Sequence, residues 1–522
     1  MLHTFTSDGK NLTPREVVAV ARSSGVRVEM SPAARDRVQR SRAVVDGIVN
    51  RGEVVYGITT GFGAFKDRVI PHDELAQLQV NLILSQCVGV GPPLPAEVVR
   101  AMMLSRAHAL SLGYSGIRPA TLQLLYDMLN AGVHPLIPEQ GSVGASGDLA
   151  PLSHMALGMM GGGQAEYRGT FMPSAEALSR AGLEPCVLSP KEGLALSNGT
   201  SLMSALLSLA VVDAAMLCDT ADAVGAMTLE ALEGVPAAFD PRIHAARGQQ
   251  GQMATAANIR TLIEGSNLLH SGSPASSFDY DSTNDGVSNR KSGKVQDAYS
   301  LRCIPQVHGS ARDTVAYVNN IVTIELNSAN DNPLVFPDDG IPDEEQVSAN
   351  GKSKSQDAKP RIVSGGNFHG APVSVASDFL GIGVSQLANI SERRQARLVD
   401  VAAHGGLLPA FLIEHGGLNS GFMMVQYTSA ALASENKSLA HPASVDTVPT
   451  SANVEDHVSM GPIAGRHARA IVANTARVLA LEAMMAAQAL DFRLRAEPRS
   501  RMGKGTRVAY DLVRGQVPFL EK

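Results

Sequence analysis

Three long apolar stretches with few helix-breaking residues constrain this chain more than any other feature. They cover residues 201–232, 373–390 and 464–490 and are rich in alanine, leucine and valine; residues 97–112 form a shorter stretch of the same kind. Long periodic runs of good helix formers predict helices, and a run as apolar as 464–490 predicts a long buried bundle helix. Because strand signals are few and short, the sequence predicts a mainly α fold.

The composition points to extensive burial and to a small-molecule partner. Hydrophobic residues make up 44% of the 522 residues, charged residues only 18%, and tryptophan is absent. So few charges favour burial in an oligomer. The formal net charge is −6 and no basic cluster occurs, which argues against a nucleic-acid partner.

The cysteines and the N-terminus suggest a cytoplasmic protein. Cys87, Cys186, Cys218 and Cys303 show no metal-ligand spacing, so we expect reduced thiols and no bound metal. The first residues lack the basic and apolar regions of a secretory signal. The apolar segment 201–217 is interrupted by an aspartate, so we expect a core helix rather than a membrane span, and no membrane partner.

Two polar stretches, 271–292 and 337–361, interrupt the helical pattern. The first is dense in serine, aspartate and glycine, and the second contains a Pro-Asp-Asp-Gly turn sequence. Because the helical pattern resumes soon after each of them, the sequence predicts surface loops or insertions rather than linkers between domains.

The run 141–152, GSVGASGDLAPL, has a centre that can form an electrophile from backbone atoms. If the Gly147 amide nitrogen attacks the Ala145 carbonyl carbon and two waters leave, one of them with the Ser146 hydroxyl, a five-membered imidazolone with an exocyclic methylene results. Glycine suits the attacking position because a residue without Cβ lets the chain fold back tightly. The loop must be strained and crowded for this reaction to occur.

Six blocks, in the same order, give the chain a strong resemblance to the aromatic amino-acid ammonia-lyase and aminomutase family, which includes histidine, tyrosine and phenylalanine ammonia-lyases. Members of that family use a 4-methylidene-imidazol-5-one group. Besides the run 141–152, the blocks are YGITTGFG at 56–63, GYSGIRP at 113–119, LSNGT at 196–200, VQDAYSLR at 295–302, SGGNFH at 364–369 and SENK with PASVD between 434 and 446.

The resemblance implies a fumarase/aspartase-like architecture. It implies an N-terminal mixed catalytic domain over 1–210 and an elongated helical domain over 211–522, packed into a homotetramer whose active sites each take residues from three subunits. It also implies that the prosthetic group forms autocatalytically from Ala145-Ser146-Gly147, with neither metal nor pyridoxal phosphate. The implied reaction eliminates ammonia from an aromatic L-amino acid to give the trans-arylacrylate; attack on the group by the substrate amine or by its ring both stay open.

The resemblance assigns roles to five further residues. Tyr56 is the expected general base, which requires a pKa below the usual ~10 of tyrosine. Tyr299 is expected to help organise the electrophile and the amine. Arg302 resembles the fork that clamps the substrate carboxylate. Asn198 and Gln296 resemble the residues that hydrogen-bond the ring oxygen and the substrate, as an oxyanion hole does.

Other positions have competing structural interpretations. Glu435 resembles a glutamate near the substrate amine, but a surface carboxylate is an equally good reading. Phe336 and Phe368 resemble aromatic lining of the pocket, or are ordinary core. His154 and His369 are expected to be structural hydrogen-bonding residues, since no HExxH-type pair occurs.

Substrate selectivity is expected from the pair Ser85-Gln86. Histidine lyases typically have Ser-His here, tyrosine lyases His-Leu and phenylalanine lyases Phe-Leu, so this chain departs from all three. A neutral glutamine amide can bond an imidazole nitrogen or a phenol hydroxyl. The residues at 58–60 and 325–330 are more similar to those of tyrosine and phenylalanine enzymes, whereas Glu435 favours a histidine substrate.

The sequence therefore ranks four functions. Elimination from tyrosine or phenylalanine, giving coumarate or cinnamate, comes first, and histidine ammonia-lyase activity, giving urocanate, comes second. A 2,3-aminomutase is third. An inactive helical scaffold is the non-enzymatic alternative, which the retained Ala145-Ser146-Gly147, Tyr56 and Arg302 argue against.

Overall fold

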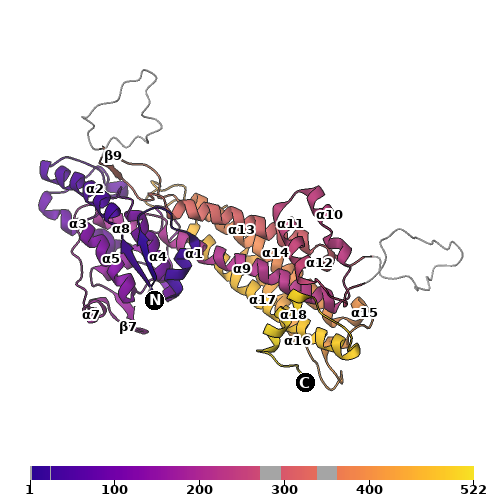
Figure 1. Ribbon diagram of the computed structural model, residues 1–522. Coiled ribbons are helices and arrows are strands. Elements are labelled where there is room, and N and C mark those ends of the chain that lie inside the picture. Colours follow the sequence, from indigo (N-terminus) through magenta and orange to yellow (C-terminus); the bar gives the residue numbers. More distant parts are fainter. Residues whose placement is uncertain (1–2, 24, 271–295, 338–360, 522) are drawn as a thin grey trace. The chain divides into compact units, whose positions relative to one another are not determined.

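The computed structural model describes residues 3–23, 25–270, 296–337 and 361–521. The predicted polar stretches 271–292 and 337–361 lie almost wholly outside them. Within the described residues helices α1 to α18 dominate, and the strands form four small sheets of two or three strands (Figure 1). The predicted mainly α fold is confirmed.

The chain forms two compact units, each made of three segments. Unit 1 comprises Met1–Val212, Asn319–Asp378 and Pro442–Arg466. Unit 2 comprises Asp213–Val318, Phe379–His441 and His467–Lys522. The predicted division was into 1–210 and 211–522. In the structure, Asn319–Asp378 and Pro442–Arg466 also belong to the N-terminal unit.

Unit 1 begins with a parallel β-α-β crossover. Strand β1 (His3–Ser7) pairs in parallel with β2 (Val26–Met30). Helix α1 (Pro14–Arg22) connects them and starts at a capping box, in which the Thr13 side chain and the Glu16 carboxylate each accept the other's backbone N–H.

Helix α4 (Ala96–Leu110) of unit 1 is buried along nearly its whole length. It packs against α1 and α5, and α3, α6 and α8 pack against one another. The other helices that lie wholly in unit 1 are α2 (Pro32–Arg51), α3 (Leu75–Gln86), α5 (Pro119–Ala131), α6 (Leu149–Met159), α7 (Ser174–Arg180) and α8 (Glu192–Ser197).

Three short antiparallel sheets complete unit 1. The first pairs β3 (Val90–Pro93) with β5 (Pro138–Gln140). The second has the order β4-β6-β7, and the third pairs β8 with β9. Their strands are β4 (Val133–Pro135), β6 (Gln164–Tyr167), β7 (Thr170–Pro173), β8 (Leu334–Phe336) and β9 (Arg361–Val363).

Four long helices contribute residues to both units, and Figure 1 shows them running alongside one another in unit 2. They are α9 (Ser201–Ala231), α13 (Ile304–Leu326), α14 (Ala371–Val399) and α17 (Gly461–Ala496). The other helices of unit 2 are α10 (Pro241–Arg247), α11 (Gln250–Leu262), α12 (Tyr299–Arg302), α15 (Val401–His404), α16 (Met423–Leu439) and α18 (Lys504–Arg514).

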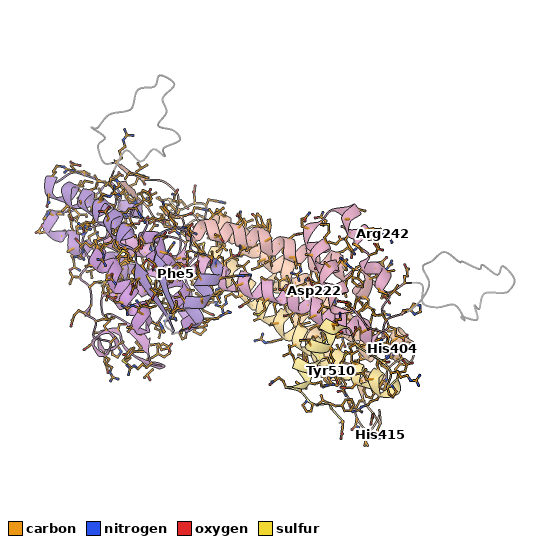
Figure 2. The ribbon with its side chains drawn as sticks, in the orientation of Figure 1. Phe5, Asp222, Arg242, His404, His415 and Tyr510 are labelled. Atoms are coloured by element: carbon orange, nitrogen blue, oxygen red, sulfur yellow. The ribbon has the colours of Figure 1, made fainter. Side chains whose placement is uncertain are left out.

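A buried polar network joins these four helices inside unit 2. Asp222, labelled on α9 in Figure 2, accepts a hydrogen bond from His308 Nδ1 on α13 at 2.8 Å. Arg394 on α14 forms an ion pair with Glu482 on α17, and both side chains are fully buried. Paired in this way, buried charges fix how the helices pack, because a slipped arrangement would leave a charge without its partner.

Three of the described helices are long and apolar enough to cross a membrane, judged by length and composition: α9, α14 and α17. The apolar segment 201–217, which we expected to form a core helix, is the first part of α9, and this helix continues to Ala231. The most apolar windows of these helices are 78%, 67% and 56% buried within the protein, respectively. This burial agrees with the predicted core helix.

Candidate active site

Unit 1 contains a cavity of about 1470 Å³. Tyr56, Ser85, Gln86, Ala145, Ser146 and Asn198 all line it, so it brings together six of the predicted site residues from four separate parts of the sequence. The remaining lining comes mainly from the segments 61–70, 364–369 and 451–457.

At two positions of the predicted prosthetic-group loop, the structure leaves no room for a Cβ atom. Gly147 has φ +75°, and a Cβ built there would lie 2.2 Å from the Gly199 carbonyl oxygen. Gly144 has φ +70°, and its Cβ would lie 2.3 Å from Ser459 Oγ. Both positions need glycine for backbone conformation and for space. The loop is thus tightly folded and crowded at both glycines, in line with the predicted crowding.

Asp148 ties the end of this loop to the start of α9. Its backbone N–H donates to the Gly199 oxygen at 2.7 Å, and its Oδ2 accepts from the backbone N–H groups of Leu202 and Met203. Burial raises the pKa of the Asp148 carboxyl to about 7, against the lowering effect of those two N–H groups and of Arg106.

Asn198 provides a direct test of whether these residues fit the imidazolone. Its Nδ2 donates to the Ser146 carbonyl oxygen at 2.9 Å. Cyclisation consumes the Ala145 oxygen and keeps the Ser146 oxygen, which becomes the oxygen of the ring. Asn198 therefore already bonds the atom on which an oxyanion-hole donor would act. The residues fit the group.

Glu455 is a site residue that the sequence analysis missed. Its Oε1 accepts a hydrogen bond from the Ser146 hydroxyl at 3.1 Å, and its Oε2 accepts one from Thr450 Oγ1 at 3.1 Å. It belongs to the last segment of unit 1, far from Ser146 in the sequence. The only available signal was its position shortly after the family-like block that ends at residue 446.

Tyr56 lies at the cavity, but its surroundings do not make it a stronger acid. Burial raises the pKa of Tyr56, a hydrogen bond from the Gly63 backbone lowers it, and the nearby Glu455 carboxylate raises it again. The prediction of a lowered pKa is therefore wrong for the contacts described within one chain. Its role as general base stays a prediction and requires a further positive group.

The selectivity pair lies at the end of α3. Ser85 donates to the Leu82 carbonyl oxygen at 2.8 Å. Gln86 Oε1 accepts a hydrogen bond from Ser153 Oγ on α6 at 2.9 Å. With its oxygen engaged in this way, the Gln86 amide has N–H donors left for a molecule in the cavity.

The two predicted phenylalanines differ. Phe368 lines the cavity, but Phe336 does not: it packs against Tyr114, with ring centroids 5.4 Å apart. The strand β8 turns Phe336 toward this neighbour. Phe336 does not line the cavity, so the prediction that it lines the substrate pocket is wrong for this chain, and the alternative of ordinary packing holds.

Four predicted residues belong to unit 2 and do not line this cavity. Three of them form a group: the Arg302 guanidinium lies 4.7 Å from the centre of the Tyr299 ring, and Arg302 Nη1 donates to Gln296 Oε1 at 2.9 Å. Tyr299 is 70% exposed and lines a second hollow of about 380 Å³ with Arg393 and Arg397. The fourth, Glu435, is exposed on α16.

His154 and His369 each form a hydrogen bond with the backbone of a segment distant in the sequence. His154 Nε2 accepts from the Gly89 backbone at 3.2 Å, as expected of a structural residue. His369 Nε2 bonds the His457 carbonyl oxygen at 3.2 Å, and the two rings stack at 5.7 Å. Among the described residues no group of three or more His, Cys, Asp or Glu side chains could hold a metal ion.

All four cysteines are free thiols, and Cys218 is buried. Burial raises the pKa of Cys87 and Cys186 to about 11 and that of Cys218 to about 12. These three thiols are therefore poor nucleophiles near neutral pH.

Comparisons with known proteins identify the family of the chain. A family model described as "Aromatic amino acid lyase" matches residues 12–515. Histidine ammonia-lyase of Chloroflexus aurantiacus is 50% identical over 517 residues, covering 98% of this chain and 92% of its own length.

Two solved structures are similar over nearly the whole chain. Histidine ammonia-lyase from Trypanosoma cruzi has a TM-score of 0.85 and 41% identity, covering 99% of this chain and 90% of its own. Phenylalanine aminomutase from Pantoea agglomerans has a TM-score of 0.88 and 34% identity, covering 100% and 96%. The fold is thus the fumarase/aspartase-type fold of these enzymes. The chain belongs to the aromatic amino acid lyase family and is a carbon–nitrogen lyase with ammonia-lyase activity.

Proposed function

We propose that this enzyme is a histidine ammonia-lyase that converts L-histidine to urocanate and ammonia. The observation that carries the proposal is the 50% identity, over 98% of the chain, to a protein named histidine ammonia-lyase. This reverses the ranking drawn from residues 58–60 and 325–330, which placed tyrosine and phenylalanine first. Identity over nearly the whole chain is stronger evidence of the substrate than similarity in two short segments.

The geometry at Gln86 supports a histidine substrate. A neutral imidazole carries one acceptor nitrogen, and the Gln86 amide, with its oxygen engaged by Ser153, offers N–H donors. A phenyl ring offers no such acceptor and, once bound over Gln86, would bury this donor without a partner. Leaving a buried polar group without a partner costs about 1–3 kcal/mol, which disfavours phenylalanine.

We also propose that the methylidene-imidazolone forms in this chain from Ala145-Ser146-Gly147. Once formed, the group supplies an electrophilic methylene that makes the substrate amine a better leaving group. Asn198 would hold the ring oxygen, and the phenolate oxygen of Tyr56 would take the proton from the substrate β-carbon. The Gly57 and Gly63 turns, both at positive φ, let the Tyr56 segment close over the substrate and exclude water.

The remaining groups come, in our proposal, from other subunits of a homotetramer. Arg302 would clamp the substrate carboxylate as a bidentate fork. Its positive charge beside Tyr56 would lower the pKa of the phenol, opposing the burial and the Glu455 carboxylate that raise it. The exposure of Tyr299, beside Arg302 and Gln296, supports the idea that this group faces a partner.

Specificity constants for histidine, tyrosine and phenylalanine test the substrate. We expect the wild-type enzyme to prefer histidine by more than about tenfold, which corresponds to roughly 1.4 kcal/mol of transition-state discrimination. Each product is followed by its ultraviolet absorbance. A preference of that size for tyrosine or phenylalanine would refute the proposal, and β-amino acid products would point to an aminomutase.

A further inference from the structure

We propose that Glu455 is a positioning residue for maturation of Ala145-Ser146-Gly147: it holds the Ser146 hydroxyl in the orientation from which that hydroxyl leaves. The inference rests on the proposed formation of the prosthetic group in this chain. It assigns to Glu455, which also lines the cavity, a role in building the active site before any substrate binds.

The contacts of Ser146 carry the argument. Two side chains among the described residues are hydrogen-bonded to it: Asn198 donates to its carbonyl oxygen, and the Glu455 carboxylate accepts from its hydroxyl. Asn198 bonds an atom that the mature ring keeps. Glu455 bonds an atom that the mature ring loses, so this contact exists only before maturation.

The carboxylate is itself held in place. Thr450 Oγ1 donates to its other oxygen, and the backbones of Thr450 and Glu455 exchange hydrogen bonds of 2.9 and 3.3 Å. Between them Ser451, Ala452 and Asn453 all have positive φ, of 52°, 52° and 66°. Such a turn is costly for residues other than glycine and persists where the surroundings fix it, which is typical of functional sites.

The chemistry explains why the hydroxyl needs a fixed direction. In the dehydration step the Cα–H and Cβ–Oγ bonds of Ser146 break and the Cα=Cβ bond forms. The proton and the hydroxide leave as one water, and no atom is oxidised or reduced overall. A serine side chain otherwise samples three staggered rotamers, and elimination needs the one that aligns the two breaking bonds. A hydrogen bond to a fixed carboxylate selects one rotamer.

The test measures the mass of the intact chain during cell-free synthesis. Wild-type protein should become lighter by two waters, whereas Ser146→Ala should never complete this change. Glu455→Ala should mature roughly tenfold to a hundredfold more slowly, because it loses a hydrogen bond to a charged group. Glu455→Gln keeps a weaker, neutral acceptor and should fall between Glu455→Ala and wild type.

The matched control is Asp456→Asn. It removes the same charge from the next residue, which is exposed, lines the same cavity and has no described hydrogen bond to Ser146, so we expect it to mature at the wild-type rate. Thr450→Val keeps the carboxylate but removes its support, and should slow maturation less than Glu455→Ala does. Circular dichroism of each variant reports whether it is folded.

The outcomes separate the inference from the proposed function. An active wild-type protein of full, unmodified mass would refute formation of the group itself. Wild-type maturation rates in folded Glu455→Ala would overturn the role of Glu455 and leave the proposed function intact. If Glu455→Ala does not fold, Glu455→Gln and Thr450→Val decide: unchanged rates in both would overturn the inference, and slowed rates in both would support it.

Discussion

Tyr56 shows how far the chemistry of one residue depends on its neighbours. Tyr56→Phe removes the phenolic oxygen and nothing else, so the fold and the two-water loss should be unchanged. Turnover should fall roughly a hundredfold to ten-thousandfold, the usual contribution of a general base. Steady-state kinetics with histidine check this. A change confined to the Michaelis constant would show that Tyr56 binds substrate rather than taking a proton.

Ser153 should influence substrate choice although it does not line the cavity. Gln86→Leu removes the donor to the imidazole and should lower the specificity constant for histidine by roughly tenfold to a hundredfold, the equivalent of one buried hydrogen bond. Ser153→Ala only frees the amide to rotate, and should give a smaller loss in the same direction. If both variants match the wild type on all three amino acids, the Gln86 amide does not recognise substrate.

Single residues were predictable where their chemistry is local in the sequence. Ala145, Ser146 and Gly147 are consecutive in the sequence, so their capacity to cyclise could be inferred from these three residues alone. Glu455 reaches Ser146 across 309 positions, and no spacing or periodicity encodes that contact. For Tyr56 the sequence indicated the position but could not indicate its burial or the Glu455 carboxylate beside it, both of which raise the pKa, so the expected lowering was wrong.

At the scale of elements, the helices followed from the sequence and the sheets did not. The four predicted helical stretches correspond to α4, α9, α14 and α17, and differ from them mostly at the ends. A long helix repeats its apolar pattern over many turns, which makes the pattern easy to recognise in the sequence. Strands of three to five residues, such as β4 or β8, give too short a pattern, and they form because tertiary neighbours pair with them.

The packing of β1 against α4 should make stability depend on pH. His108 on α4 bonds Ser7 of β1 through Nδ1, and burial lowers the pKa of His108 from 6.5 to about 4. Below pH 6.5 the unfolded chain binds a proton here that the folded chain does not bind until about pH 4. Unfolding is therefore favoured progressively as the pH falls through this range.

The variant His108→Gln tests that dependence. It removes the titrating group, so its melting temperature should fall less steeply than that of the wild type between pH 6.5 and 4. Asp148, whose pKa is raised to about 7, acts in the opposite direction and is common to both proteins. The control, His415→Asn, changes an exposed histidine (Figure 2) and should keep the wild-type slope. Equal slopes for His108→Gln and wild type would exclude His108 as a source.

At the scale of the whole molecule, shared active sites can be tested by mixing two inactive variants. Tyr56→Phe and Arg302→Lys each impair a different residue of the proposed site. If these residues come from different subunits, co-expression in equal amounts should leave about a quarter of the sites with neither change. The mixture should then have about a quarter of the wild-type activity, measured on co-purified protein.

The activity of the mixture also identifies the opposite case, in which each active site lies within one chain. If one chain supplied both Tyr56 and Arg302 to a site, every site in the mixture would carry one substitution, and activity would not exceed the mean of the two variants. Mixing after separate purification, without exchange of subunits, provides the control, since it should give only that mean. Light scattering of the wild type reports the number of subunits.

The crowding around the reactive loop also divides the glycines of unit 1 into two classes of mutational tolerance. Gly144, Gly147 and Gly199 have positive φ, and an added Cβ at any of them would collide with a neighbour. Gly365 and Gly366 line or adjoin the same cavity, yet a Cβ there meets nothing within 4 Å. A library aimed at new substrates should therefore leave the first three untouched and diversify the last two, where a side chain has room to reshape the site without altering the loop that makes the electrophile.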